Sequence, residues 1–262
     1  MVQQLSLFSQ INPTELSLVK ASLSSLTGQS HPQKYQHFVL ICKPCVILQF
    51  EPNSTKQQFE QYKIQLKTNI PAAPTGSEPS ESIVEKVIKE SKEWALQVYD
   101  IPTFATQQHN TSNNSGGGGG GGGGTSGNGS GGSSSKKSKI NINSQTFSES
   151  IINVSKDETI ETVLKPLGYE IQTPYKVEGE RFHYGNITIE LFQVLVLVDG
   201  KWQKLTTSTA MKCFINVAKL TDLENSSRSI QELNSLKIEL QGLVELGVPD
   251  KNHMDSRIGF TR

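Results

Sequence analysis

Long apolar runs and an excess of charge of either sign are both absent from this sequence. The longest apolar segment, Leu191–Val198, contains Gln193 and is much shorter than the ~18–20 residues that span a bilayer. The 262 residues include 25 Lys+Arg and 25 Asp+Glu. A neutral chain lacks the bulk attraction that basic proteins have for phosphates, so we expect no direct binding to nucleic acid or membrane. We interpret the one basic cluster, Lys136–Lys139, as a solubilising charge run rather than a nuclear import signal.

Cysteine is scarce, and the N-terminus lacks the basic and apolar regions of a secretory signal peptide. We therefore expect an intracellular protein with reduced cysteines. Cys42 and Cys45 form a C-x-x-C motif, but a redox motif of this type opens a helix, and here the strand-like run Val46–Phe50 follows. A zinc site would need two further ligands, and no second C-x-x-C or H-x₃₋₅-H is present. We predict that both cysteines are buried in strands, with a redox or a metal role as the alternatives.

Glycine, in contrast, is concentrated in one place. Nine consecutive glycines, Gly116–Gly124, lie within a segment of low complexity, 104–139. Such a segment has almost nothing to bury, so we predict a disordered linker. Because the entropic cost of closing a loop grows only logarithmically with its length, the linker can interrupt a single domain. The expected organisation is one domain in two parts, 1–103 and 140–262.

Four segments have the pattern of helices. Asn12 is the predicted cap of the first, which has Leu at regular spacing and ends at Gly28. Residues 80–92 favour a second helix, and the capping box Ser155–Glu158 predicts a short third one. A last helix is indicated by an apolar stripe formed by Ile230, Leu233, Leu236, Leu240 and Val244.

Runs of β-branched and apolar residues predict many short strands. They lie at 2–8, 38–50 (two strands around Lys43-Pro44), 94–98, 147–154, 169–177, 181–184, 187–198, 201–206 and 211–219. Turns are expected at Glu178-Gly179-Glu180, at Tyr184-Gly185-Asn186 and at Asp199-Gly200. This order predicts an α+β fold, built on a closed or strongly curled antiparallel β-barrel with flanking helices.

The strand at 187–198 is apolar on both faces from Leu191 onward, whereas a strand with one wet face alternates. Something must therefore cover each face. Our first candidate for the cover is the last helix, and a partner subunit is the second. If a partner covers it, the candidate contact residues are Phe192, Val194 and Val196.

Glu178-Gly179-Glu180 is similar to part of the E-x-E-x-K signature of the triphosphate tunnel enzymes, but Phe182 stands at the lysine position. We therefore predict no catalytic, cofactor-binding or metal-binding residues and no cofactor. A divergent metal-dependent phosphohydrolase of this barrel type is the alternative. The enzyme needs a tunnel lined by carboxylates and cations, whereas a scaffold is expected to have an apolar, filled interior.

Two stretches resemble the family of Mediator complex subunit 18. Residues 1–28 are similar to its opening strand and leucine-striped helix, and 159–197 are similar to its second block. In that block the shared positions are Leu167-Gly168-Tyr169, Gly179 to Phe182, and Gly185. The resemblance covers most of the chain outside 51–92 and 104–139.

This resemblance implies a closed antiparallel β-barrel and a nuclear, non-enzymatic subunit of the Mediator head module. It further implies a coactivator role in transcription by RNA polymerase II. The implied partners are subunit 20, a second barrel of this kind, and a helix of subunit 8.

Deleting residues 110–138 should leave the fold intact, because this segment has no apolar anchor. Thermal melts of the full-length and the shortened chain should agree to within about 1 kcal/mol, which is the effect of a typical single substitution. A larger loss would mean that the segment packs against the domain.

Overall fold

The computed structural model describes residues 1–47, 61–70, 80–106 and 141–258, in which strands outnumber helices. The strands that form the barrel are β1 (Val2–Ile11), β2 (Gln33–Pro44), β4 (Ile64–Asn69), β5 (Glu93–Tyr99), β7 (Asn141–Asn153), β8 (Tyr169–Tyr184), β9 (Ile187–Val198) and β11 (Thr209–Val217). Shorter strands are β3 (Gln61–Tyr62), β6 (Thr103–Thr106), β10 (Lys201–Lys204) and β12 (Arg257–Ile258). The helices are α1 (Leu16–Thr27), α2 (Ser80–Glu90), α3 (Ile160–Leu164), α4 (Leu223–Glu239) and α5 (Lys251–Met254).

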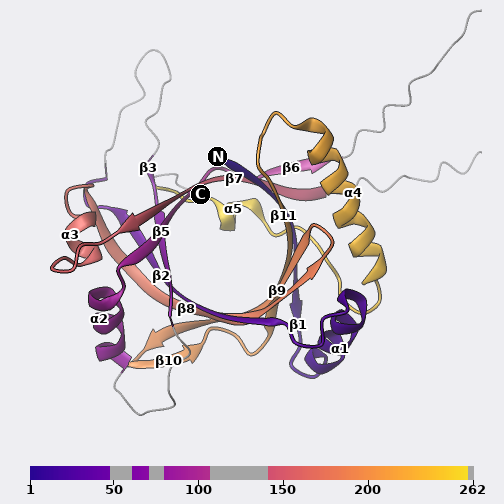
Figure 1. Cartoon of the computed structure of the whole chain (residues 1–262), viewed down its shortest axis with the longest axis horizontal. Helices are drawn as coiled ribbons and strands as arrows, with labels where there is room; N and C mark the ends of the chain where they lie inside the picture. Colours follow the sequence, from indigo (N-terminus) through magenta and orange to yellow (C-terminus); the bar gives the residue numbers. More distant parts are fainter. Residues whose placement is uncertain (48–60, 71–79, 107–140, 259–262) are drawn as a thin grey trace, which may run out of the picture.

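The eight long strands form one closed antiparallel barrel (Figure 1). Their order is β1-β11-β9-β8-β2-β4-β5-β7, and the pairing of β7 with β1 closes the ring. Strands from before and after the glycine-rich segment are therefore joined in a single sheet. The predicted fold class is confirmed. Within the described part of the chain, no helix is long and apolar enough to cross a membrane.

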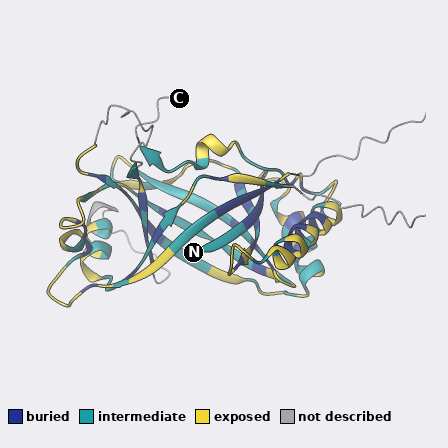
Figure 2. Ribbon diagram, turned by 90° about the horizontal axis from the view of Figure 1, so that it is seen from above, coloured by how far each residue is buried: buried dark blue, intermediate teal, exposed yellow. Residues whose placement is uncertain are grey.

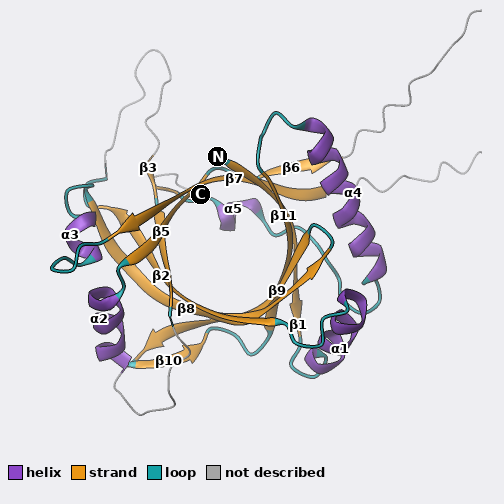
Figure 3. Cartoon of the chain, in the orientation of Figure 1, coloured by secondary structure: helices purple, strands orange, loops and turns teal. Residues whose placement is uncertain are grey.

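The apolar core lies outside the barrel wall, between the strands and the helices (Figure 3). One cluster joins β1, β9 and β11 to α1 and α4, and its fully buried members include Leu5, Leu7, Val19, Leu23, Cys213, Leu233 and Leu236. On the opposite side, a second cluster joins β2, β4 and β5 to α3, with partly buried residues of α2 packed against it; it includes Phe38, Leu40, Leu66, Trp94 and Ile160. Figure 2 shows the exposed residues of the helices on their outer sides.

Two predicted helix ends differ from the structure. Helix α1 ends at Gly28, with a φ of 69°, as predicted, but it begins at Leu16 and its cap position is Glu15 instead of Asn12. The carbonyl of Asn12 accepts a hydrogen bond from the Glu15 amide at 3.0 Å, so Asn12 belongs to a preceding turn. Helix α3 begins after Thr159, whose capping box uses Thr162; the predicted box at Ser155–Glu158 is a turn instead.

The prediction of a turn at Glu178-Gly179-Glu180 is wrong. The two strands expected there are one continuous strand, β8. A Cβ on Gly179 would collide with the carbonyl oxygen of Leu191 and would lie 2.9 Å from Cβ of Phe192. Glycine at this position therefore permits a close approach of β8 and β9 and does not serve a chain reversal.

The other two turns are confirmed. Gly185 has a φ of 58°, and Asp199 and Gly200 have φ values of 50° and 70°. Positive φ at both central residues is what a type I′ hairpin turn requires, and Asp199-Gly200 joins β9 to β10.

Two further segments are corrected. The predicted pair of strands around Lys43-Pro44 is a single strand that ends at Pro44, and residues 48–50 lie outside the described part. Residues 104–106 belong to β6, so the predicted linker begins too early; its remainder, 107–139, also lies outside the described part.

The last helix does not cover the second half of β9. Helix α4 packs against β1 and β11, and the cluster to which it belongs includes no residue of β9 beyond Leu191. The neighbours of this half are β8, where Tyr175 pairs with Val196, and β10, where Trp202 pairs with Leu197. Phe192 to Leu197 all have intermediate exposure, so the strand is partly covered on both faces.

Replacing Gly179 by alanine should destabilise the protein by roughly 1–3 kcal/mol, because the added methyl group has no room between β8 and β9. Urea denaturation measures the change. Gly247→Ala is the matched control: nothing lies within 4 Å of its added Cβ, and it should cost less than about 0.5 kcal/mol. Equal effects of the two substitutions would contradict the steric account.

Candidate functional site

The inner face of the barrel carries a pair of opposite charges on β8 and β9. Arg181 and Glu190 are directly paired across these strands. Nε and Nη2 of Arg181 donate hydrogen bonds to Oε1 of Glu190 at 3.0 and 2.6 Å. Both side chains are largely shielded from solvent, with 25% and 15% of their surface exposed. An ion pair with two charge-assisted hydrogen bonds is well fixed in orientation.

Other polar side chains surround this pair from several strands. The charge of Glu190 affects the pKa values of Tyr35 on β2, Lys67 on β4, Tyr99 on β5 and Lys212 on β11. Groups from so many strands can share one carboxylate only if they face the barrel interior. The prediction of an apolar, filled interior for a scaffold is therefore wrong.

The sequence pattern did not reveal this interior because it does not tell which face of a strand is inside. The apolar rows of the strands point outward to the helices, as Leu5, Leu7, Ile189 and Cys213 show. The intervening residues point inward. A closed barrel with helices on its outside has two shielded faces, and here the polar row occupies the inner one.

Burial shifts the pKa values of these interior groups. It raises the pKa of Tyr35 and Tyr99, and it raises that of Tyr175 to about 12. It lowers the pKa of His37 to about 4 and that of Lys212 to about 8. In each case the cause is the loss of hydration of the charged form. At neutral pH the tyrosines and His37 are therefore uncharged.

The glutamates that resemble part of the triphosphate tunnel signature do not lie on the same face of the sheet as Glu190. Glu180 faces outward, where its carboxylate bonds Lys20 of α1 at 2.8 Å, whereas Glu190 faces inward. Among the residues that the structure describes, no group of three or more His, Cys, Asp and Glu could hold a metal ion.

The cysteines of the C-x-x-C motif have different environments. Cys42 is buried, as predicted, and burial raises the pKa of its thiol to about 12. Cys45 is exposed, which contradicts the prediction that it is buried in a strand. It follows Pro44, the last residue of β2, and its amide donates to the carbonyl of Gly168 at 2.8 Å.

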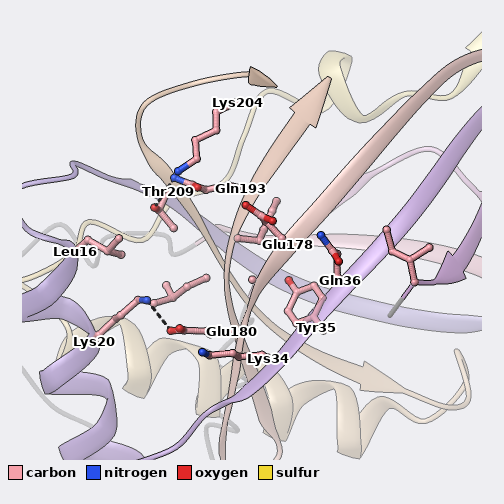
Figure 4. Close-up of a pocket in the computed structure, with 14 residues that line it drawn as sticks. Leu16, Lys20, Lys34, Tyr35, Gln36, Glu178, Glu180, Gln193, Lys204 and Thr209 are labelled. Carbon is pink, nitrogen blue, oxygen red and sulfur yellow. Dashed lines mark hydrogen bonds and ion pairs between the residues drawn. The ribbon is translucent and has the colours of Figure 1, made fainter. Parts of the chain in front are cut away.

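A groove of about 660 Å³ lies on the outer face of the barrel, next to α1 (Figure 4). Its floor is formed by β2, β8 and β9. It is lined by the apolar residues Leu16, Ile70, Leu191 and Phe192 and by the charged residues Lys20, Lys34, Glu178, Glu180 and Lys204, with Tyr35, Gln36, Gly179, Gln193 and Thr209 between them. This mixture of apolar and charged side chains suits a peptide or a helix with one apolar side.

The three residues predicted to contact a partner, Phe192, Val194 and Val196, lie on the same face of β9 as Glu190, because side chains alternate along a strand. Each of them is only partly exposed. Phe192 also borders the groove, beside Gly179 of β8. Sequence reasoning missed Lys20, Lys34 and Lys204, because isolated lysines on three separate elements carry no signal of their convergence.

Comparisons with known proteins agree over the whole barrel. The model of a family described as Med18 protein matches residues 3–115 and 132–257. Mediator of RNA polymerase II transcription subunit 18 of Kluyveromyces lactis is 28% identical over 285 residues, covering 98% of each chain. The protein of the same name from Yarrowia lipolytica is 27% identical over 274 residues, covering 98% of this chain and all of the other. A chain in the structure of the Schizosaccharomyces pombe Mediator head module has the same fold, with a TM-score of 0.60 at 13% identity, covering 93% of this chain and 97% of that one.

Lys212 should make stability depend on pH. Its pKa in the folded protein is about 8, below the ordinary value of 10.5. Between these two pH values the lysine is therefore protonated in the unfolded chain but mostly neutral in the folded protein. Stability should therefore rise with pH in that window. The expected gain between pH 8 and 10, relative to Lys212→Met, is on the order of 2 kcal/mol.

Urea denaturation of both proteins in phosphate-free buffer measures this gain. Lys201→Met, at an exposed position on β10, is the control and should titrate in parallel with the wild type. Parallel pH profiles of the wild type and Lys212→Met would exclude a lowered pKa.

Proposed function

This chain belongs to the Med18 family, and we propose that it works as a subunit of the Mediator head module in transcription by RNA polymerase II. The observation that carries the proposal is the match of the family model on both sides of the glycine-rich segment. The relatives align over almost their full length and are named as Mediator subunit 18. A subunit of this complex acts in the nucleus.

The subunit is non-catalytic, as is its family. The alternative of a metal-dependent phosphohydrolase is therefore not retained. The proposed function is one of protein–protein contact, in which the helices and the outer wall of the barrel present surfaces to neighbouring subunits.

The finer proposal concerns two partners, subunit 20 and a helix of subunit 8, which the family resemblance implies. We assign the helix of subunit 8 to the groove beside α1. Apolar side chains on its floor, such as Leu191 and Ile70, suit the apolar face of an amphipathic helix. This part of the outer wall lies between α1 and β10, and no helix of the described residues covers it (Figure 1).

Charge favours an acidic border on that helix. Lys34 and Lys204 are exposed at the groove, and neither has a described carboxylate within ion-pair distance. Complementary charges at the rim of an interface guide association and orientation. Contacts of Phe192, Val194 and Val196 with a partner stay a prediction, and of the three only Phe192 borders the groove.

The experiment is affinity purification of the tagged full-length protein from its source cells. Head-module subunits, including subunits 8 and 20, should co-purify with it. The groove is tested by the double variant Lys34→Glu/Lys204→Glu, which should lose at least about tenfold of the bound subunit 8, because two attractive contacts become repulsive.

Lys201→Glu is the matched control, since this lysine is exposed on β10 but does not line the groove. It should retain subunit 8. Normal recovery of subunit 8 with the double variant would exclude the groove as its binding site. It would not affect the conclusion that the protein is a subunit of the complex. Absence of all Mediator subunits from the wild-type purification would overturn the proposed function itself.

A further inference from the structure

The ladder between β9 and β11 is shorter than the ladder between β1 and β11. Strand β11 pairs with β1 as far as Val217, but with β9 only as far as Phe214, because β9 begins at Ile187. Within the described part of the chain, no other strand pairs with β11 beyond this point on the side of β9. Outside the ladders, the backbone of residues 215–218 makes no hydrogen bond with a described residue. The last part of β11 is therefore an open edge of the barrel sheet.

A cavity of about 570 Å³ lies along this open edge. It is lined by five consecutive residues, 215–219, by Asn186 just before β9, and by one face of α4, which packs against β11 (Figure 1). That face consists of residues three or four positions apart, which lie on one side of a helix. They are Asp222, Asn225, Arg228, Ser229 and Glu232. This cavity, the α4 slot, thus occupies the place into which β9 would continue if it began earlier.

The two carboxylates of the α4 slot are bound by neighbours within it. The side chain of Asp222 accepts hydrogen bonds from the backbone N–H of Asn225 at 3.1 Å and from Nδ2 of the same residue at 2.6 Å. Glu232 accepts from Nδ2 of Asn186 at 3.1 and 3.2 Å and from Nε of Arg228 at 3.0 Å. Neither carboxylate is therefore left as an unpaired negative charge.

Several donors of the α4 slot, in contrast, have no partner. Lys219 is exposed, and no carboxylate of the described chain lies within ion-pair distance of it. Arg228 has 70% of its side chain exposed and uses only Nε for Glu232, so its terminal nitrogens make no hydrogen bond with a described residue. Oγ of Ser229, a residue that is only 7% exposed, makes none either. The unpaired charge of the slot is therefore positive, and its free side-chain groups are donors.

We propose that the α4 slot binds an extended, acidic segment of a partner protein, which adds a strand to the open edge of β11. Its backbone pairs with the N–H and C=O groups that alternate residues of this edge direct away from β1. Its carboxylates lie near Lys219 and Arg228 and accept hydrogen bonds from them. The slot shares no lining residue with the groove beside α1, so this binding is separate from that of the proposed subunit 8 helix.

Fluorescence anisotropy of a labelled peptide tests the proposal on the full-length protein. The probe alternates Thr with Glu over about six residues, the usual length of a strand. It should bind at one site per chain, at least about tenfold more tightly than a peptide with Lys in place of each Glu. A third peptide, methylated on every backbone nitrogen, has no main-chain donors and should also bind at least about tenfold more weakly. Absence of saturable binding of the acidic peptide up to about 1 mM would overturn the proposal, and so would equal binding of either control peptide.

Charge reversal locates the site. The double variant Lys219→Glu/Arg228→Glu should weaken binding of the acidic peptide at least about tenfold, because two attractive contacts become repulsive. Lys34→Glu/Lys204→Glu is the matched control, since it reverses two charges of the groove and none of the α4 slot, and it should retain the peptide. Equal losses in both variants would mean attraction to net charge alone. Unchanged binding by the first variant would place the peptide elsewhere, and either result refutes the assignment.

Hydrogen exchange of main-chain amides identifies the mode of binding in the wild type, so it does not depend on the folding of any variant. Saturating acidic peptide should slow exchange in residues 215–218 at least about tenfold, because the added strand protects their free N–H groups. Exchange in β10, an edge strand beside the groove, should not change. Unaltered exchange in residues 215–218 while the peptide is bound would exclude strand addition and overturn the proposal.

Discussion

The pairing of β7 with β1 closes the barrel, and the division of every strand into an outer and an inner face depends on that closure. Side chains alternate along a strand, so each strand contributes one row to the helices and one to the interior. On β1, Leu5 and Leu7 belong to the outer cluster, whereas the intervening Ser6 accepts a hydrogen bond from Asn143 of β7 at 3.0 Å. The hydrophobic stabilisation of this protein is therefore located in two layers outside the wall.

An inner row that is not needed for the apolar core can carry polar and charged groups. The close contact of β8 with β9 at Gly179 lies in the same pair of strands that holds Arg181 opposite Glu190. The register that brings these charges together also prevents a side chain at position 179. Lys212 of β11 lies opposite Glu190 on the other side of β9, so this inner row carries charges of both signs.

The outer wall has a different role. Helices α1 and α4 cover one side and α2 and α3 the opposite one, which leaves the stretch of β2, β8 and β9 beside α1 as a groove. A scaffold subunit needs surfaces that a neighbour can recognise on a frame that does not rearrange. The closed sheet supplies the frame, and the groove combines an apolar floor with lysines that a partner of opposite charge can reach.

The sequence by itself determined the local elements and the family. Helix α1 follows from its leucine spacing and Gly28, and the β9–β10 turn follows from Asp199-Gly200, because these signals involve neighbours along the chain. Gly179 was misread as a turn, since only the approach of β9 shows that its missing side chain makes room for another strand. The inward row with Lys67 and Lys212, and the groove with Lys34 and Lys204, were decided by the tertiary structure alone. Their members come from strands far apart in the chain, and it is the closure of the barrel that brings them together and fixes which face of each strand is inside.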